Sequence, residues 1–99
     1  MPLYAVLLED ELTRAAEIRA RHMPQHLAFL EQHADRIRAA GPLREADGTV
    51  KGGLWLVEAE EPAAVEALVH ADPFHSSGLR RSVRICAWDR VFADGQRLK

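Results

Sequence analysis

The chain has 99 residues, a formal net charge of −2 and one cysteine. This length suits a single domain, the lack of a basic excess argues against a nucleic-acid partner, and a lone cysteine excludes an internal disulfide or a cysteine-rich metal framework. The apolar run at Leu3–Leu8 is too short for a membrane span or a signal peptide, so a cytoplasmic protein with no membrane partner is expected.

The first part of the chain predicts a strand followed by helical sequence. The continuous apolar run at Leu3–Leu8 is typical of a buried strand. Helical periodicity then extends from Leu12 to Arg38, but an interior proline removes a backbone donor and clashes with the preceding turn. Pro24 therefore predicts a break, with one helix over residues 12–21 and a second that begins at Pro24 itself. The second helix should bury one stripe of side chains, namely Leu27, Leu30, Ala34 and Ile37.

The rest of the chain predicts three strands and one helix, separated by turn signals. Gly41-Pro42 ends the helical region, and Asp47-Gly48 is typical of a turn between strands. Pro62 suits the first turn of a helix, and Asp72-Pro73 breaks the chain after it. The expected elements are a strand over 40–45, a strand over 54–59, a helix over 61–71, a loop or single helical turn at PFHSSGL, a strand over 81–92 and a loose tail over 93–99.

The predicted order β-α-β-β-α-β matches the ferredoxin-like split βαβ fold, an α+β domain in which both helices cover one face of an antiparallel sheet. In the last strand, Val83 and Ile85 point to one face, and Cys86 and Trp88 point to the other. The face that the helices leave open should therefore be covered as well, so a homodimer is expected. Cys86 is expected to act as a small hydrophobe rather than as a nucleophile.

His26 is the first candidate for chemistry. It would lie in the first turn of the helix that begins at Pro24, where the helix dipole disfavours an added positive charge. The imidazole should then stay neutral near pH 7, which suits a general base. Spacing alone favours a plainer role, in which His26 only satisfies a backbone group at the start of the helix.

The same segment raises the question of a metal site. His22 and His26 are four residues apart, so on an unbroken helix they would share a face. Pro24 interrupts that register, and although His33 is available, no spacing singles out a third ligand. No metal and no cofactor are therefore expected.

Asp72 is the second candidate. An acidic residue before proline, at the start of a helical turn, is a common N-cap that accepts backbone N–H groups. A carboxylate has two oxygens, so Asp72 can also orient His26 and stabilise it when it takes up a proton.

Four further residues are candidates for binding a substrate. His75 and Ser76 follow Asp72 and are expected to line a pocket, because no Gly-x-Ser-x-Gly elbow marks a nucleophilic serine. Arg81 and Arg84 belong to a group of arginines near the end of the chain, which is most simply a solvated surface. The alternative is a local anion site that offsets the charge of a substrate.

Several stretches together resemble the YciI-like (YCII-related) family. RHMPQHLAFL resembles its R…P-x-H-L-x-x-L segment, AGPL its G-P-L strand entry, and GGLWLVEAEEPAAVEALVHADPF its strand, helix and D-P-F/Y block. SGL and RSVRICAWDRVF resemble its closing G-L and final strand, so the match covers nearly the whole chain. After the first strand the family often has an aspartate followed by Lys-Pro, whereas this chain has Glu9, Asp10, Glu11 and Leu12. No pocket role is therefore assigned to that segment.

The resemblance implies a single ferredoxin-like domain over residues 1–99, of the dimeric α+β barrel type, that forms a homodimer. It also implies an active site made of a histidine and an aspartate, which map onto His26 and Asp72. The predicted function is an enzyme of the isomerase or lyase type that moves a proton on a small acidic or aromatic molecule, and the family is linked to dehydrochlorination of hydroxylated aromatics. The alternative is a dimeric module that binds a small molecule or regulates a larger system without chemistry.

Overall fold

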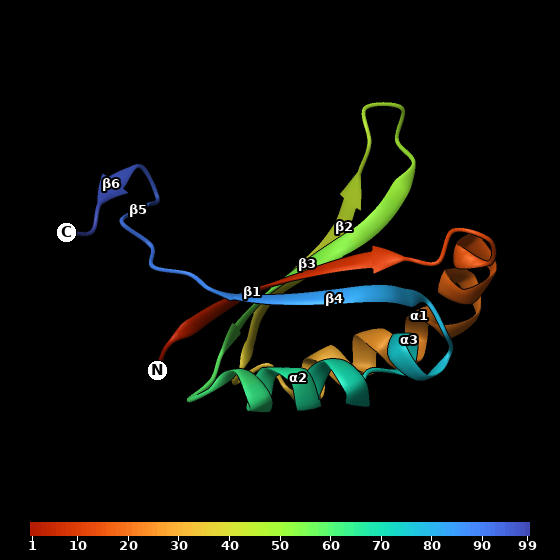
Figure 1. Ribbon diagram of the computed structural model, residues 1–99, viewed down its shortest axis with the longest axis horizontal. Coiled ribbons are helices and arrows are strands. Elements are labelled where there is room, and N and C mark those ends of the chain that lie inside the picture. Colours follow the sequence, from red (N-terminus) through yellow and green to blue (C-terminus); the bar gives the residue numbers. More distant parts are fainter.

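The computed structural model describes residues 1–99 and contains a four-stranded antiparallel sheet in the order β2-β3-β1-β4, with all three helices on one face (Figure 1). The predicted ferredoxin-like α+β architecture is confirmed. The elements are β1 (Leu3–Asp10), α1 (Ala15–Gln32), β2 (Ile37–Arg44), β3 (Val50–Glu58), α2 (Pro62–Ala71), α3 (Pro73–Ser76), β4 (Arg80–Ala87), β5 (Phe92–Ala93) and β6 (Gln96–Arg97). No helix is long and apolar enough to cross a membrane.

The core lies between the sheet and the helices. Successive strand side chains point to opposite faces, and in β1 the buried ones are Tyr4, Val6 and Leu8. They pack in one cluster of 11 buried residues with side chains from β3, α1 and α2, such as Trp55, Val57, Phe29, Val65 and Leu68. Burial of this apolar area fixes α1 and α2 on the sheet.

One continuous helix replaces the two helices that Pro24 predicted. α1 runs for 18 residues through Pro24, which is exposed. Proline cannot bond the carbonyl of Ala20, but that residue is exposed too, so water can satisfy the carbonyl. The helical register therefore continues and places Ala15, Ile18, His26 and Phe29 on the buried side.

The predicted apolar stripe of the second helix is consequently wrong. Leu27 is 49% exposed, and Ala34 lies beyond the end of α1 in an exposed turn. Ile37 is buried, but as the first residue of β2. Only Leu30 of that stripe packs against the core from α1.

The end of the chain also differs from the prediction. β4 stops at Ala87, because its partner strand begins at Leu3 and the last bond of the pair runs from the Trp88 N–H to the Leu3 carbonyl, at 2.9 Å. Residues 92–97 then form a small hairpin, β5–β6, in place of the end of a strand and a loose tail. Gly95 adopts a φ of +76°, which glycine tolerates without steric cost.

The other face of the sheet carries no helix (Figure 1). A shallow apolar depression of about 240 Å³ lies on it and is lined by Ala5, Leu54, Leu56, Cys86, Ala87 and Trp88. Leu7, on the same face of β1, is 38% exposed. We call this surface, together with Leu7, the open sheet face.

Candidate active site

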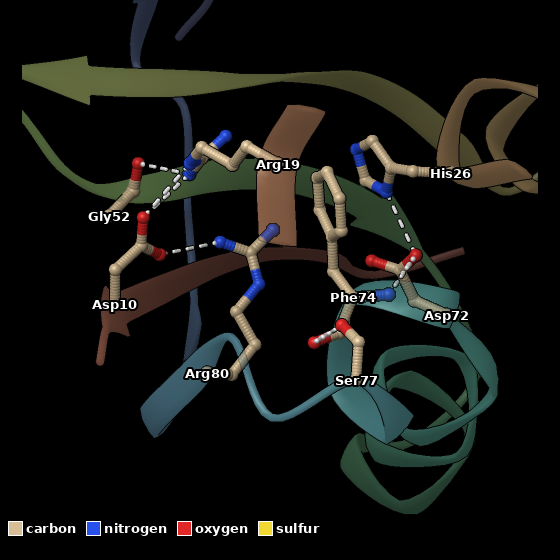
Figure 2. A network of polar contacts seen from close by, with 8 residues as sticks. All are labelled: Asp10, Arg19, His26, Gly52, Asp72, Phe74, Ser77 and Arg80. Atoms are coloured by element: carbon tan, nitrogen blue, oxygen red, sulfur yellow. Dashed lines mark hydrogen bonds and ion pairs between the residues drawn. The ribbon is translucent and has the colours of Figure 1, made fainter. Parts of the chain in front are cut away.

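His26 and Asp72 meet beneath the sheet although they lie 46 residues apart in the chain. The His26 Nδ1 and Asp72 Oδ1 atoms are 2.8 Å apart, and the two side chains are 9% and 1% exposed (Figure 2). His26 comes from the buried side of α1, and Asp72 lies at the junction of α2 and α3. Asp72 Oδ1 also accepts the backbone N–H of Phe74 at 3.1 Å, so the aspartate caps α3 and holds the imidazole at once.

This hydrogen bond assigns roles to the two ring nitrogens of His26. A carboxylate accepts hydrogen bonds, so the neutral ring carries its proton on Nδ1 and has its lone pair on Nε2. Nε2 has no hydrogen-bond partner in the chain, and it is not fully buried. Nε2 is therefore the atom of this pair that is open to a proton from elsewhere.

The expected helix-start position of His26 is wrong. His26 lies well inside α1, which runs from Ala15 to Gln32, so the dipole at a helix N-terminus does not act on it. No backbone group bonds the ring either, and its one partner in the chain is Asp72. The carboxylate, rather than the helix, fixes the imidazole.

Phe74 separates the histidine from a second group of charged residues. Its ring stacks on the His26 imidazole, with centroids 4.0 Å apart and an interplanar angle of 18°. On its other side, the Cζ atoms of Arg19 and Arg80 lie 5.5 and 5.4 Å from the ring centroid (Figure 2). Phe74 is fully buried, so its ring is held in place and separates the imidazole from the two guanidinium groups.

Asp10, Arg19 and Arg80 form an ion-paired group that we call the arginine cluster. Arg19 Nε and Nη2 lie 3.0 and 2.9 Å from Asp10 Oδ2, and Arg80 Nη1 lies 3.0 Å from Asp10 Oδ1. Asp10 and Arg80 are almost wholly enclosed. Burial lowers the pKa of Arg80, Asp10 opposes that shift, and Arg19 adds to it; the ordinary pKa of arginine is high enough for the group to stay charged. Within the cluster one carboxylate faces two guanidinium groups, which leaves a surplus of one positive charge, and Asp72 also acts on Arg80 to raise its pKa.

Two glycines of β3 lie beside this cluster and allow a close approach of the neighbouring strand backbones. Gly53 is paired with Leu8, and a side chain there would approach Arg80 Nη1 to 3.5 Å and the Gly41 carbonyl to 3.3 Å. At Gly52 a Cβ atom would lie 1.8 Å from the Leu8 carbonyl oxygen, which no side chain permits. The Gly52 carbonyl accepts Arg19 Nη2 at 3.3 Å.

Comparison with known protein families identifies the domain. The model of the YCII-related domain matches residues 3–89. The chain belongs to the YCII-related family. Among curated proteins, no match to the chain was found.

Two solved structures resemble this YCII-related domain. The 5-chloro-2-hydroxyhydroquinone dehydrochlorinase of Burkholderia phenoliruptrix AC1100, solved in complex with 2,5-dihydroxybenzoquinone, is 27% identical with a TM-score of 0.77, over 88% of this chain and 93% of that one. An uncharacterized NIPSNAP domain protein from Burkholderia xenovorans is 14% identical with a TM-score of 0.51, over 91% of this chain and 94% of that one. The second likeness concerns the fold alone.

In this YCII-related chain, the two predicted arginines lie outside the site. Arg81 and Arg84 are exposed, and Arg84 is opposite Leu7 on the open sheet face. A register shift at Glu9/Asp10 makes Arg80 the partner of Asp10 and leaves Arg81 out of the pairing. The arginines beside Phe74 are Arg19 and Arg80, whereas Arg81 and Arg84, the two predicted to offset the charge of a substrate, are not there.

His75 and Ser76 are not brought to His26 either. The His75 ring stacks on His70, with centroids 4.5 Å apart. The Ser76 hydroxyl donates to the carbonyl of Pro73 at 3.2 Å and is exposed. Ser76 belongs to the exposed surface, and His75 is half-buried, with an Nδ1 atom that has no hydrogen-bond partner; neither side chain bonds to or stacks on His26.

The structure gives no support to a metal site at His22 and His26. Nowhere in the chain do three His, Cys, Asp or Glu side chains gather as metal ligands. The Nδ1 atom of His26 is already occupied by Asp72. His26 therefore differs from His22 in having a carboxylate partner, an arrangement that suits proton transfer.

Proposed function

We propose that this YCII-related protein is an enzyme of the isomerase or lyase type that moves a proton on a small acidic or aromatic molecule. His26 Nε2 takes or gives the proton, and Asp72 orients the ring. The single observation that carries the proposal is the enclosed 2.8 Å hydrogen bond between His26 Nδ1 and Asp72 Oδ1, because it leaves Nε2 free and places a carboxylate beside the imidazolium that forms during proton transfer.

The proton transfer can be followed from the geometry. When Nε2 accepts a proton from the substrate, the imidazolium that forms lies against Asp72, whose Oδ2 atom has no hydrogen-bond donor of its own. The carboxylate charge is therefore available to stabilise the imidazolium. Return of the proton to another atom of the substrate completes an isomerisation, and departure of a leaving group completes an elimination. A positioned general base of this kind contributes roughly 10²–10⁴-fold in rate.

The likeness to a dehydrochlorinase favours the elimination. That protein is named for removing the elements of hydrogen chloride from a chlorinated hydroxyhydroquinone, and it was solved with a hydroxylated quinone. For the present chain the corresponding step is loss of a substrate proton to Nε2 and departure of chloride. The proposed substrate class is thus a small hydroxylated ring.

The test is chloride release from 5-chloro-2-hydroxyhydroquinone by the purified protein and by His26→Gln and His26→Ala. We expect release by the native chain and a fall of about 10²–10⁴-fold in both variants. His22→Gln is the matched control, because His22 lies on the same helix without a carboxylate partner. Equal release by native chain and His26 variants contradicts the proposal.

We also propose that the protein is a single cytoplasmic domain that pairs with a second copy through the open sheet face. The face carries an apolar depression, no helix covers it, and burial of such area stabilises association. Light scattering coupled to size exclusion should give twice the chain mass for the native protein and the chain mass for Leu56→Lys. A native monomer at micromolar concentration contradicts this part.

One observation favours the non-catalytic alternative, a module that binds a small molecule. His26 lines none of the five surface cavities, although its Nε2 atom is not fully buried. If the protein only binds a ligand, hydroxylated rings should bind without any chemical change. Recovery of unaltered substrate after saturating incubation separates the two functions.

A further inference from the structure

A cavity of about 370 Å³ lies between the start of α1 and the start of β3, and it is unlike the other hollows of the surface. Its lining is formed by Leu12, Ala15, Ala16, Arg19, Thr49 and Val50. Arg19 is the one charged residue among them. A cavity of this size accepts a molecule with a single small ring.

Arg19 is held in place by groups behind the cavity wall. Asp10 accepts from Nε and Nη2, and the Gly52 carbonyl accepts from Nη2 at 3.3 Å. No group of the chain bonds Nη1. The guanidinium is therefore preorganised and keeps donors for a partner from outside.

The charge of the arginine cluster selects the kind of partner. Asp10 balances one of its two guanidinium groups, and Arg80 is too enclosed to meet an ion from solution, with 3% of its side chain exposed. Arg19 is 15% exposed and faces the cavity. A single negative charge on the ligand neutralises the three-residue cluster, whereas a neutral ligand leaves the surplus positive charge in place and gives Nη1 no charged acceptor.

We propose that this cavity binds a small apolar monoanion, a ring that carries one carboxylate or phenolate group, with the anionic oxygen on Arg19 and the ring against Leu12, Ala15 and Val50. The inference goes beyond the proposed function and does not rest on it, because Phe74 lies between Arg19 and the His26 imidazole and His26 does not line this cavity. Arg19 is seven residues before His26 on the same helix, so the two lie two turns apart, about 10 Å along the axis. Phe74 contacts both side chains.

The test compares benzoate with benzamide, which has nearly the same shape and no charge. Each is titrated into the full native chain at constant ionic strength and followed by ¹H–¹⁵N NMR. Benzoate should shift the amide signals of residues 12–19 and 49–50, and it should bind at least about tenfold more tightly than benzamide, because a charge-assisted hydrogen bond is lost with the charge.

Two variants and one control locate the binding site. Arg19→Gln keeps Asp10 paired with Arg80 and should reduce the benzoate affinity at least about tenfold while changing benzamide binding little. Ala16→Leu places a larger side chain in the cavity and should weaken both ligands; leucine is a good helix former, so α1 is expected to remain intact. Arg21→Gln removes an exposed arginine of the same helix and should leave both affinities unchanged.

Several results would overturn the inference. They are equal affinities for benzoate and benzamide, unaltered benzoate binding in folded Arg19→Gln and Ala16→Leu, benzoate shifts confined to other parts of the chain, or no binding of benzoate at millimolar concentration. Failure of the proposed function is distinguishable, because His26→Gln should lower turnover about 10²–10⁴-fold and leave benzoate binding intact. Arginine-dependent binding without turnover upholds the inference and refutes the catalysis.

Discussion

Two buried aspartates stand on opposite sides of Phe74, and their surroundings give them different roles. Both Asp10 oxygens are taken by guanidinium groups. At Asp72, Oδ1 accepts from His26 and from the Phe74 amide, whereas Oδ2 has no donor. The carboxylate of Asp10, with both oxygens ion-paired, holds parts of the fold together. The carboxylate of Asp72 has a free oxygen, and its charge can stabilise His26 when the ring gains a proton.

The largest effect should come from removing the charge of Asp10. Asp10→Asn leaves Arg19 and Arg80 enclosed with two uncompensated charges, and loss of one partner of a buried ion pair costs about 3–5 kcal/mol. Urea unfolding measures this change in the free energy of unfolding.

The exposed pair of Arg14 and Glu17 provides the control for that experiment. Arg14 Nη2 and Glu17 Oε1 are 3.4 Å apart, and the side chains are 59% and 60% exposed. Glu17→Gln should therefore lower the free energy of unfolding by less than about 1 kcal/mol. A loss in Asp10→Asn no greater than in this control would show that the arginine cluster does not brace the fold.

Removing the charge of Asp72 should act on turnover more than on folding. Asp72→Asn keeps the side-chain shape but weakens stabilisation of the imidazolium, and we expect kcat to fall about a hundredfold, or close to 3 kcal/mol of transition-state stabilisation. KM should stay near its native value, because the ligand contacts are unchanged. Steady-state kinetics with 5-chloro-2-hydroxyhydroquinone measure both constants; a change confined to KM would argue that Asp72 only shapes the binding site.

The smallest effect concerns the two glycines beside the arginine cluster. Gly52→Ala brings a Cβ to 1.8 Å from the Leu8 oxygen and forces the strands apart, for a loss of about 1–3 kcal/mol. Gly53→Ala meets its nearest atoms at 3.3 and 3.5 Å and should cost less than about 1 kcal/mol. Thermal unfolding ranks the two variants, and the reverse order would contradict the packing described for β1 and β3.

The sequence predicts the order of the elements but not the continuity of α1. Element order followed from local signals, such as Asp47-Gly48 between β2 and β3 and Pro62 at the start of α2. The break at Pro24 was wrong because a local rule ignored tertiary packing, which holds α1 on the sheet through His26 and Phe29 while Pro24 stays in solvent.

The His26–Asp72 pair and the arginine cluster differ in how far the sequence predicts them. His26 and Asp72 could be nominated from family motifs, although the reason given for a neutral His26 does not apply inside a helix. Asp10 and Arg80 are 70 residues apart, and a register shift between strands selects Arg80 over Arg81. The Gly52-Gly53 pair was the available signal, since adjacent glycines in a strand mark a close approach of other groups.

The most direct test of the account is the protonation pattern of the His26 ring, read from the ¹⁵N shifts and long-range ¹H–¹⁵N couplings of its imidazole. We predict that the neutral form of the ring carries its proton on Nδ1 and leaves Nε2 bare, and that Asp72→Ala removes this preference. A neutral ring with its proton on Nε2 would contradict the claim that Asp72 prepares His26 for proton transfer. A protonation pattern that Asp72→Ala leaves unchanged would contradict it as well.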